Sequence, residues 1–442
     1  MPTTLEERIK IMTESANGEP TWRLARRMGW QASTIRKWRL RGQKGGRAGL
    51  VSAMGRPKRG ILSSYPAEVG ATILRWRKAN PGWGAETLVA ELKRHPCFAG
   101  QKVPSAATVN RFLQEQGLTS EREKQVELPE SQPQPSGLAH DVWEMDAQGY
   151  QFVPEVGMIS LINLNDRVSH LRLLSYPCFL GGKRVERHAN RADYQIALRL
   201  AFTHWGRPKV LQVDHESVFF DNKTKSPFPT PLHLWLIALN IQLTFSRFGR
   251  PTDQGMTERS HQLWSRQVLQ GQQFTSWEAL YQALQERRDF LNTHLPCASL
   301  DRQPPLVASP DAHFSNRPYR PEFEADILDL QAVYAYLVQG QWFRRVAANG
   351  IISLGGNVYY VGTKWYRQQV EVRFSAQSHR FLCYNQAGEL IKQFSWKGDL
   401  LSTLTGSVDI LANLPVFQLH LPFCWEDIRN QHFRRLAFDM LL

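Results

Sequence analysis

The stretch KVLQVDHESVF, residues 209–219, predicts a short buried strand that ends at a carboxylate. Val210, Leu211 and Val213 supply the apolar run, and Asp214 follows it directly. Ligands of open α/β sheets bind outside the carboxyl ends of the strands. Asp214 is therefore a candidate site residue, although an aspartate at a strand end often only caps a turn.

Asp146 lies inside another predicted strand, in the stretch WEMDAQG (143–149). A charged residue midway along a strand is expensive to bury and needs a partner or a cation. If this strand and the strand before Asp214 are adjacent in the sheet, both carboxylates face one point. Such a pair is a better candidate site than either residue alone.

Glu258 is the third candidate, in GRPTDQGMTERSH (249–261), at the start of a helix predicted from Gln254 to about Leu269. Three converging carboxylates would form the hard-oxygen site that Mg²⁺ prefers. Two ions about 4 Å apart could activate an attacking oxygen and stabilise a leaving one in phosphoryl transfer. Taken alone, a glutamate in the first turn of a helix often has no role beyond a favourable interaction with the helix dipole. Three further carboxylates compete for these roles: Glu216, Asp221 and Asp253.

The pattern around these residues is that of a mixed α/β sheet with helices on its faces. From residue 140, three strand-like segments are followed by alternating helix and strand. After a proline-rich stretch, residues 342–396 contain short alternating segments with Asn-Gly and Gly-Gly turns. These predict a small antiparallel barrel.

The positive charge of the chain is concentrated at its N-terminal end. The formal net charge is +14, and residues 1–118 hold 21 Lys and Arg against 8 Asp and Glu, or +13. The first segment predicts a helix-turn-helix whose third helix would enter the major groove of DNA. A packed helical bundle with solvated charges is the alternative. The basic residues of the third helix are Arg36, Lys37, Arg39 and Arg41.

A second helix-turn-helix is predicted after a basic stretch, GRPKRG (55–60). Its residues Arg56, Lys58 and Arg59 could lie in a minor groove, or the stretch could be a plain basic linker. Residues 119–139 are rich in Glu, Gln, Ser and Pro and predict an interdomain linker.

Two classes of protein are excluded by composition. No apolar run approaches the ~20 residues of a membrane span, and the N-terminus is unlike a signal peptide. The five cysteines are far apart and form no Cys-x-x-Cys pair, which argues against a disulfide framework and fits a reducing cytosol.

The three carboxylate stretches resemble the catalytic blocks of the superfamily of DDE transposases and retroviral integrases. The separations, 68 positions from Asp146 to Asp214 and 44 from Asp214 to Glu258, fall within the range of that superfamily. The chain departs from the pattern after the second aspartate, where the family usually has Asn-Gly and this chain has His215-Glu216. Residues 290–308 are similar to the segment that follows the core in that superfamily, where an Asn and a His precede a Leu and paired prolines. Three other stretches are similar to bacterial insertion-sequence transposases with paired helix-turn-helix domains: residues 46–60, 80–92 and 344–362.

The resemblance implies a ribonuclease-H-like core in which Asp146, Asp214 and Glu258 hold Mg²⁺ or Mn²⁺, as two ions. Gln262 and Arg266, one and two helical turns beyond Glu258, would then hold transposon-end DNA, with ordinary surface polarity as the alternative. His261 is expected to be structural.

The expected fold class is multidomain α+β, and the expected function is that of a DNA transposase. It would bind transposon ends, expose a 3′-OH and join it to target DNA. A catalytically weak, domesticated DNA-binding regulator is the alternative. The expected partners are double-stranded DNA and further copies of the chain in a synaptic complex, without a membrane, in the bacterial cytoplasm. The predicted parts are helix-turn-helix domains (1–50 and 51–118), a linker (119–139), the catalytic core (140–310), a small β-barrel (335–400) and a tail (401–442).

Overall fold

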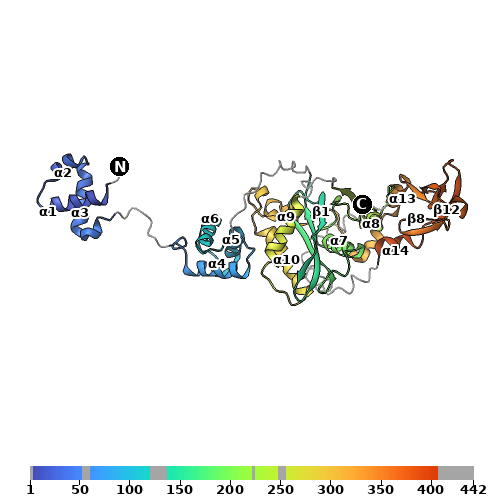
Figure 1. The fold of residues 1–442 in the computed structure, drawn as a ribbon, viewed down its shortest axis with the longest axis horizontal. Coiled ribbons are helices and arrows are strands. Elements are labelled where there is room, and N and C mark those ends of the chain that lie inside the picture. The colour runs from blue at the N-terminus through green and yellow to red at the C-terminus, as the bar shows by residue number, and fades with distance from the viewer. Residues whose placement is uncertain (1–2, 52–59, 120–136, 222–223, 247–254, 407–442) are drawn as a thin grey trace, which may run out of the picture. The chain divides into compact units, whose positions relative to one another are not determined.

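The computed structural model describes residues 3–51, 60–119, 137–221, 224–246 and 255–406, with the backbone alone for 255–258 (Figure 1). The chain forms two compact units, Met1–Gly70 and Ala71–Leu442, and each is described by itself. Within the described ranges, no helix is both long and apolar enough to cross a membrane.

The first unit contains three helices around a small apolar core. Ile11, Leu24, Ile35 and Trp38 are buried in it, which matches the helical spacing of Ile35 and Trp38 in the sequence. Gly29 ends the second helix in the left-handed conformation, at φ 70°. The helices are α1 (Leu5–Ala16), α2 (Thr21–Met28) and α3 (Ala32–Gly49).

Three more helices precede the sheet. The hydroxyl of Ser105 accepts a hydrogen bond from the amide of Thr108 and caps the last of them. A turn containing Pro81 and Gly82 separates the first two, because proline cannot continue a helix. The elements are α4 (Ala67–Ala79), α5 (Ala85–Arg94), the short η1 (Pro96–Phe98) and α6 (Ala106–Glu115).

The predicted mixed sheet is present, with strand order β2-β3-β1-β5-β6 and β4 paired with β3. β1 is antiparallel to β3 and parallel to β5, and β5 is parallel to β6. The first predicted strand is interrupted, so its end forms the separate strand β2. The strands are β1 (Val142–Ala147), β2 (Gln151–Val153), β3 (Gly157–Asp166), β4 (Arg172–Gly181), β5 (Val210–Val213) and β6 (Gln242–Phe245).

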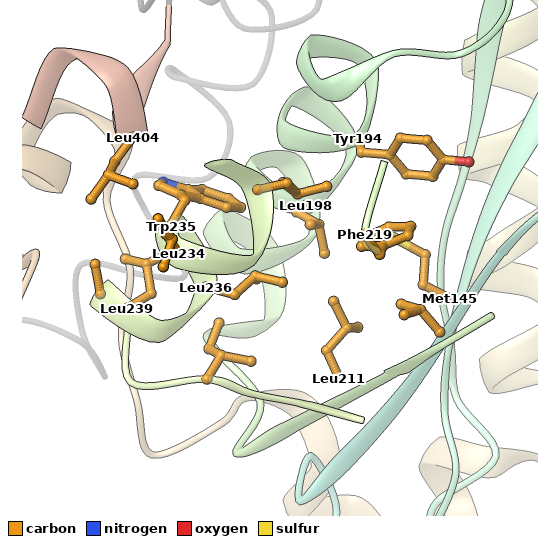
Figure 2. Packing of buried hydrophobic residues seen from close by; sticks show 14 of the residues in the cluster. Met145, Tyr194, Leu198, Leu211, Phe219, Leu234, Trp235, Leu236, Leu239 and Leu404 are labelled. Atoms are coloured by element: carbon orange, nitrogen blue, oxygen red, sulfur yellow. The ribbon is translucent and has the colours of Figure 1, made fainter. Parts of the chain in front are cut away.

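Helices cover both faces of this sheet (Figure 1). Tyr194 and Leu198 of one helix and Leu236 of the next pack over Met145 and Leu211 of the sheet (Figure 2). The predicted helix after β6 ends earlier than expected and continues as a π-helical turn, η3 (Ser265–Leu269). The helices are α7 (Arg191–Trp205), α8 (Pro231–Ala238), α9 (Gly255–Trp264) and α10 (Trp277–Thr293).

The chain then runs through short helices into antiparallel β-structure. The helices are η4 (Ala298–Leu300), α11 (Pro305–Ala308), η5 (Pro310–His313), η6 (Pro321–Phe323), α12 (Glu324–Ile327) and α13 (Leu330–Val338). The β-structure is a four-stranded sheet, β12-β11-β10-β7, and a hairpin of β8 and β9. Gly355 and Gly356 form the hairpin turn at φ 58° and 78°, as the Gly-Gly pair predicts.

A closed barrel in this region stays a prediction, because the strands pair as two sheets. The elements are β7 (Gln341–Arg345), β8 (Ile351–Leu354), β9 (Asn357–Tyr360), η7 (Thr363–Trp365), β10 (Gln369–Ser375), β11 (Arg380–Tyr384), β12 (Leu390–Ser395) and α14 (Leu400–Thr405).

Helix α14 is clamped to α7 by side chains at four-residue spacing. Arg191, Gln195 and Arg199 donate hydrogen bonds of 3.0, 2.8 and 2.6 Å to the carbonyls of residues 403, 404 and 405. These three side chains lie on one face of α7 and satisfy carbonyls that the end of α14 leaves without helical partners. Arg199 also pairs with Glu324 at 2.6 Å, and both side chains are only 3% exposed.

We expect Arg199→Met to lower the free energy of unfolding by about 3–5 kcal/mol, because it leaves the buried Glu324 carboxylate without its cation. Urea denaturation measures the change. Lys209→Met is the control, since it removes an exposed pair with Asp141 and should cost about 1 kcal/mol or less. Equal losses of unfolding free energy in the two variants would show that the buried pair of Arg199 with Glu324 stabilises the protein no more than the exposed pair does.

Candidate active site

The parallel ladder of β1 and β5 brings the first two predicted carboxylates together. Val142 lies opposite Val210, and Glu144 lies opposite Gln212. Carried two residues further, the same offset would set Asp146 opposite Asp214, which directly follows the last residue of β5. The condition on which the sequence interpretation depended, adjacency of these two strands, is met.

The carboxylate of Asp146 lies next to His261 of α9. Its Oδ1 accepts a 2.8 Å hydrogen bond from the amide of Ala147, and its Oδ2 lies 3.6 Å from Nε2 of His261. Burial lowers the pKa of His261, which favours the neutral form of its ring. In that form the ring carries no charge that balances the carboxylate of Asp146.

The sheet surface next to Asp146 is polar and buried. Asn163 lies directly opposite Asp146 in the β1–β3 ladder and is fully buried. Neither its amide group nor Nε2 of His261 has a hydrogen-bond partner among the described residues. Buried polar atoms of this kind usually bind water, an ion or a ligand.

Asp214 is held in a turn at the end of β5. Its Oδ1 accepts a 3.0 Å hydrogen bond from the amide of Glu216, and the Glu216 carboxylate accepts one from the hydroxyl of Tyr194. Burial raises the pKa of Glu216, and the charge of Asp214 adds to that effect. Burial also raises the pKa of Tyr194, with further contributions from the charges of Glu216, Asp214 and Asp146. Negative potential therefore accumulates at this corner of the sheet.

The departure from the family pattern, His215-Glu216, is built into the structure. The ring of His215 stacks on Phe245 of β6 at a centroid distance of 5.1 Å, and Glu216 anchors the turn to Tyr194. These two side chains tie the loop after β5 to its neighbours on both sides.

Glu258 lies in the first turns of α9, as predicted, but its side chain is outside the described residues. In the part of the chain whose side chains are described, no three His, Cys, Asp or Glu residues form a metal-binding group. The hydroxyl of Ser260 donates a 3.1 Å hydrogen bond to Asn165 of β3, which fixes α9 on the face of the sheet that carries Asp146.

Gln262 and Arg266 are exposed and line one cavity of about 570 Å³ next to this site. The backbone of Arg266 lies in the π-helical turn η3, and such turns are frequent at functional sites. His261 lines the same cavity and connects it to Asp146. The remaining lining residues are Gln148, Ser265, Leu269 and Gln270.

The other predicted DNA contacts belong to other parts of the chain. Arg36, Lys37 and Arg41 are exposed on α3 and Arg39 is half-buried there, in the first compact unit. The basic stretch with Arg56, Lys58 and Arg59 lies outside the described residues.

His261 and Tyr194 lie beside the candidate site, although neither is among the predicted site residues. The structural role expected for His261 stays a prediction, and its position three residues after Glu258 places it on the same helix face. Tyr194 gave no local signal, because it sits in an ordinary amphipathic helix and reaches the site only through tertiary packing.

We expect Tyr194→Phe to lower the free energy of unfolding by about 1–2 kcal/mol, because the half-buried Glu216 carboxylate loses a hydrogen bond. Chemical denaturation in the presence of a chelator measures the change. Tyr150→Phe removes an exposed hydrogen bond to His188 and should cost about 0.5 kcal/mol or less. A loss for Tyr194→Phe no larger than that of the control would show that the contact does not anchor the loop.

Several solved viral structures are similar to parts of the chain. The intasome of simian T-cell lymphotropic virus with the PP2A regulatory subunit B56 gamma aligns at 13% identity, covering 66% of this chain and 90% of the matched chain, with a TM-score of 0.30. The magnesium-bound, trimeric catalytic core of HTLV-2 integrase aligns at 11% identity over 39% of this chain and 97% of the core, with a TM-score of 0.28. The catalytic core of BIV integrase aligns at 15% identity over 39% and 95%, also with a TM-score of 0.28.

These TM-scores are too low to carry an argument, whereas one segment of the chain matches a family model in sequence. Residues 239–305 match the family model described as integrase core domain. The matched segment runs from the end of α8 through β6, α9 and α10, and therefore includes Glu258, His261 and Arg266. The match of this segment supports a relationship to the superfamily of DDE transposases and retroviral integrases.

Proposed function

We propose that the chain is a DNA transposase. It hydrolyses a phosphodiester at each transposon end to expose a 3′-OH, and that hydroxyl then attacks a phosphodiester of target DNA. The new bond joins transposon to target, and the displaced 3′-oxygen of the target leaves. The observation that supports this proposal is the β1–β5 register, whose continuation would bring Asp146 beside Asp214 in a chain with an integrase core segment.

The residues at this corner fit a pair of Mg²⁺ or Mn²⁺ ions. Asp146, Asp214 and Glu258 would hold them, since carboxylate oxygens are the preferred ligands of these hard cations. The buried, unpartnered amide of Asn163 and the accumulated negative charge around Tyr194 support a cation there. When bound, the ions supply activation of the attacking oxygen and stabilisation of the leaving one.

The protein's own residues would then bind and orient the DNA. Gln262 and Arg266 reach from α9 and η3 into the cavity beside His261, where an amide and a guanidinium can hold phosphate oxygens. Burial favours the neutral ring of His261 beside Asp146, and a neutral ring has no positive charge that would repel the cations.

End recognition is assigned to the basic N-terminal part of the chain. Arg36, Lys37, Arg39 and Arg41 of α3 would approach the major groove, and Arg56, Lys58 and Arg59 the minor groove. Because phosphate contacts release counterions, binding of end DNA should weaken steeply with salt. Joining two ends in one synaptic complex requires at least two copies of the chain.

The test combines the purified chain, Mg²⁺, labelled duplexes of the DNA that flanks its gene, and a target plasmid. We expect strand-transfer products with wild type, and a loss of about 100-fold or more in Asp146→Asn, Asp214→Asn and Glu258→Gln. Gln282→Glu, on the exposed surface of α10, is the control and should retain activity.

Other outcomes would replace this proposal. Tight, salt-sensitive binding without cleavage by wild type would identify a domesticated DNA-binding regulator. Cleavage without joining would identify a nuclease. Full activity in the Asp214→Asn variant would remove the proposed metal site.

A further inference from the structure

A turn between two N-terminal helices, residues 80–83, lies against the π-helical turn η3. The indole N–H of Trp83 donates to the carbonyl of Gln267 at 3.3 Å, and the Gln272 side chain donates to Asn80 at 2.6 Å. The contacts join residues nearly two hundred positions apart in the sequence, so they are tertiary contacts and not local turn structure.

Two glycines make this contact possible. A side chain at Gly82 would overlap the carbonyl of Arg266, and one at Gly271 would overlap the ring of Pro81. Gly271 also has φ +80°, which other residues rarely adopt, whereas the φ of Gly82 lies outside the left-handed region. The need for glycine at position 82 therefore comes from the close approach to η3 alone.

Gln267 of η3 is the centre of a buried polar network behind this contact. Its side chain donates to Thr87 of α5 at 3.0 Å and accepts from Arg287 of α10 at 3.0 Å. Arg287 also pairs with Glu91 of α5 at 2.5 Å, and its guanidinium lies 4.3 Å from the ring of Trp83. The pair is nearly fully buried, with side chains 8% and 7% exposed, so it is screened little by solvent.

The other side of η3 faces the active site. Arg266, Gln262 and His261 line the cavity next to Asp146, while Gln267, one residue after Arg266, is fixed by α5 and α10. A π-helical turn has a wider, less regular hydrogen-bond pattern than an α-helix, so its geometry depends on what packs against it. The helices α4 and α5, with the turn between them, therefore support one side of η3, the segment that carries Arg266.

We propose that the turn at residues 80–83 is a positioning element of the catalytic core: it holds η3 so that Arg266 meets the phosphate backbone of the DNA end. Gly82, Trp83 and Gln267 are its positioning residues. The proposal deepens the proposed transposase function and depends on it for its catalytic part. It gives the second helical segment a role in catalysis that is separate from any binding of DNA by its own surface.

The test compares Gly82→Ala with Gly84→Ser in the full-length chain. A Cβ at Gly84 meets nothing within 4 Å, and serine suits that N-cap position, so Gly84→Ser is a matched control two residues away. Hydrogen exchange of the backbone amides of residues 265–270 should accelerate by about tenfold or more in Gly82→Ala and stay unchanged in the control.

Strand transfer of the labelled flanking duplexes gives the second readout. In Gly82→Ala we expect turnover at saturating DNA to fall on the order of 10- to 100-fold, with the KM for the duplex changed by about twofold or less. Trp83→Phe keeps the ring over Arg287 but removes the N–H donor to Gln267. Trp83→Phe should lower turnover at saturating DNA in the same way but by a smaller factor. It replaces Gly82→Ala as the test if that variant does not fold.

Two results would overturn the proposal. Unchanged exchange at residues 265–270 in folded variants would show that the turn does not hold η3. Faster exchange with wild-type turnover would show that η3 needs no such support for catalysis. A wild-type chain without strand transfer would instead refute the transposase function, and the exchange measurement would still decide whether the turn holds η3.

Discussion

The parallel pairing of β1 with β5 is the constraint on which the site depends. Side chains alternate between the two faces of a strand. A shift of one residue in the β1–β5 register would therefore move Asp146 away from Asp214, and the apolar side chains of Trp143 and Leu211 would no longer lie on the same face of the sheet. Both of those apolar side chains are fully buried under α7 and α8. The packing of the apolar face therefore fixes the register, and the register places the carboxylates.

Much of this arrangement could be predicted from the sequence, and its limits have a physical cause. Apolar runs and turn residues are local signals, so the strand before Asp214 and the hairpin turn at Gly355 appear where they were expected, whereas the helix predicted after β6 gives way to η3 before its predicted end. Strand neighbours and side-chain contacts depend on distant segments, so the contact of Tyr194 with Glu216 gave no signal in the sequence. For His261 the helical spacing from Glu258 was the one local signal. The metal-ligand role of the three carboxylates, which their chemistry suggested and the family resemblance implied, remains a prediction.

The second helical segment illustrates the same limit. Glu91 looks like one charge of an exposed, amphipathic helix, but it is buried on α5 between Thr87 and Leu92. Its partner, Arg287, lies 196 residues later in the chain, and no periodicity could have paired them. The positive charge of the first 118 residues suggested DNA binding for this whole part, whereas several of its polar residues are engaged with the core.

Two buried ion pairs connect remote segments of this chain, Arg199 with Glu324 and Arg287 with Glu91. Desolvation offsets much of the attraction in such pairs, and apolar side chains of similar size could give equal stability. A guanidinium adds directionality, because its N–H donors are fixed in one plane and form good hydrogen bonds only with partners in a matching geometry. Arg287 must satisfy Glu91 and Gln267 at once, so α5 and η3 can shift relative to α10 only by breaking charged contacts. We infer that these pairs serve precise placement more than stability, and that the placement is needed where η3 carries Arg266 toward the site.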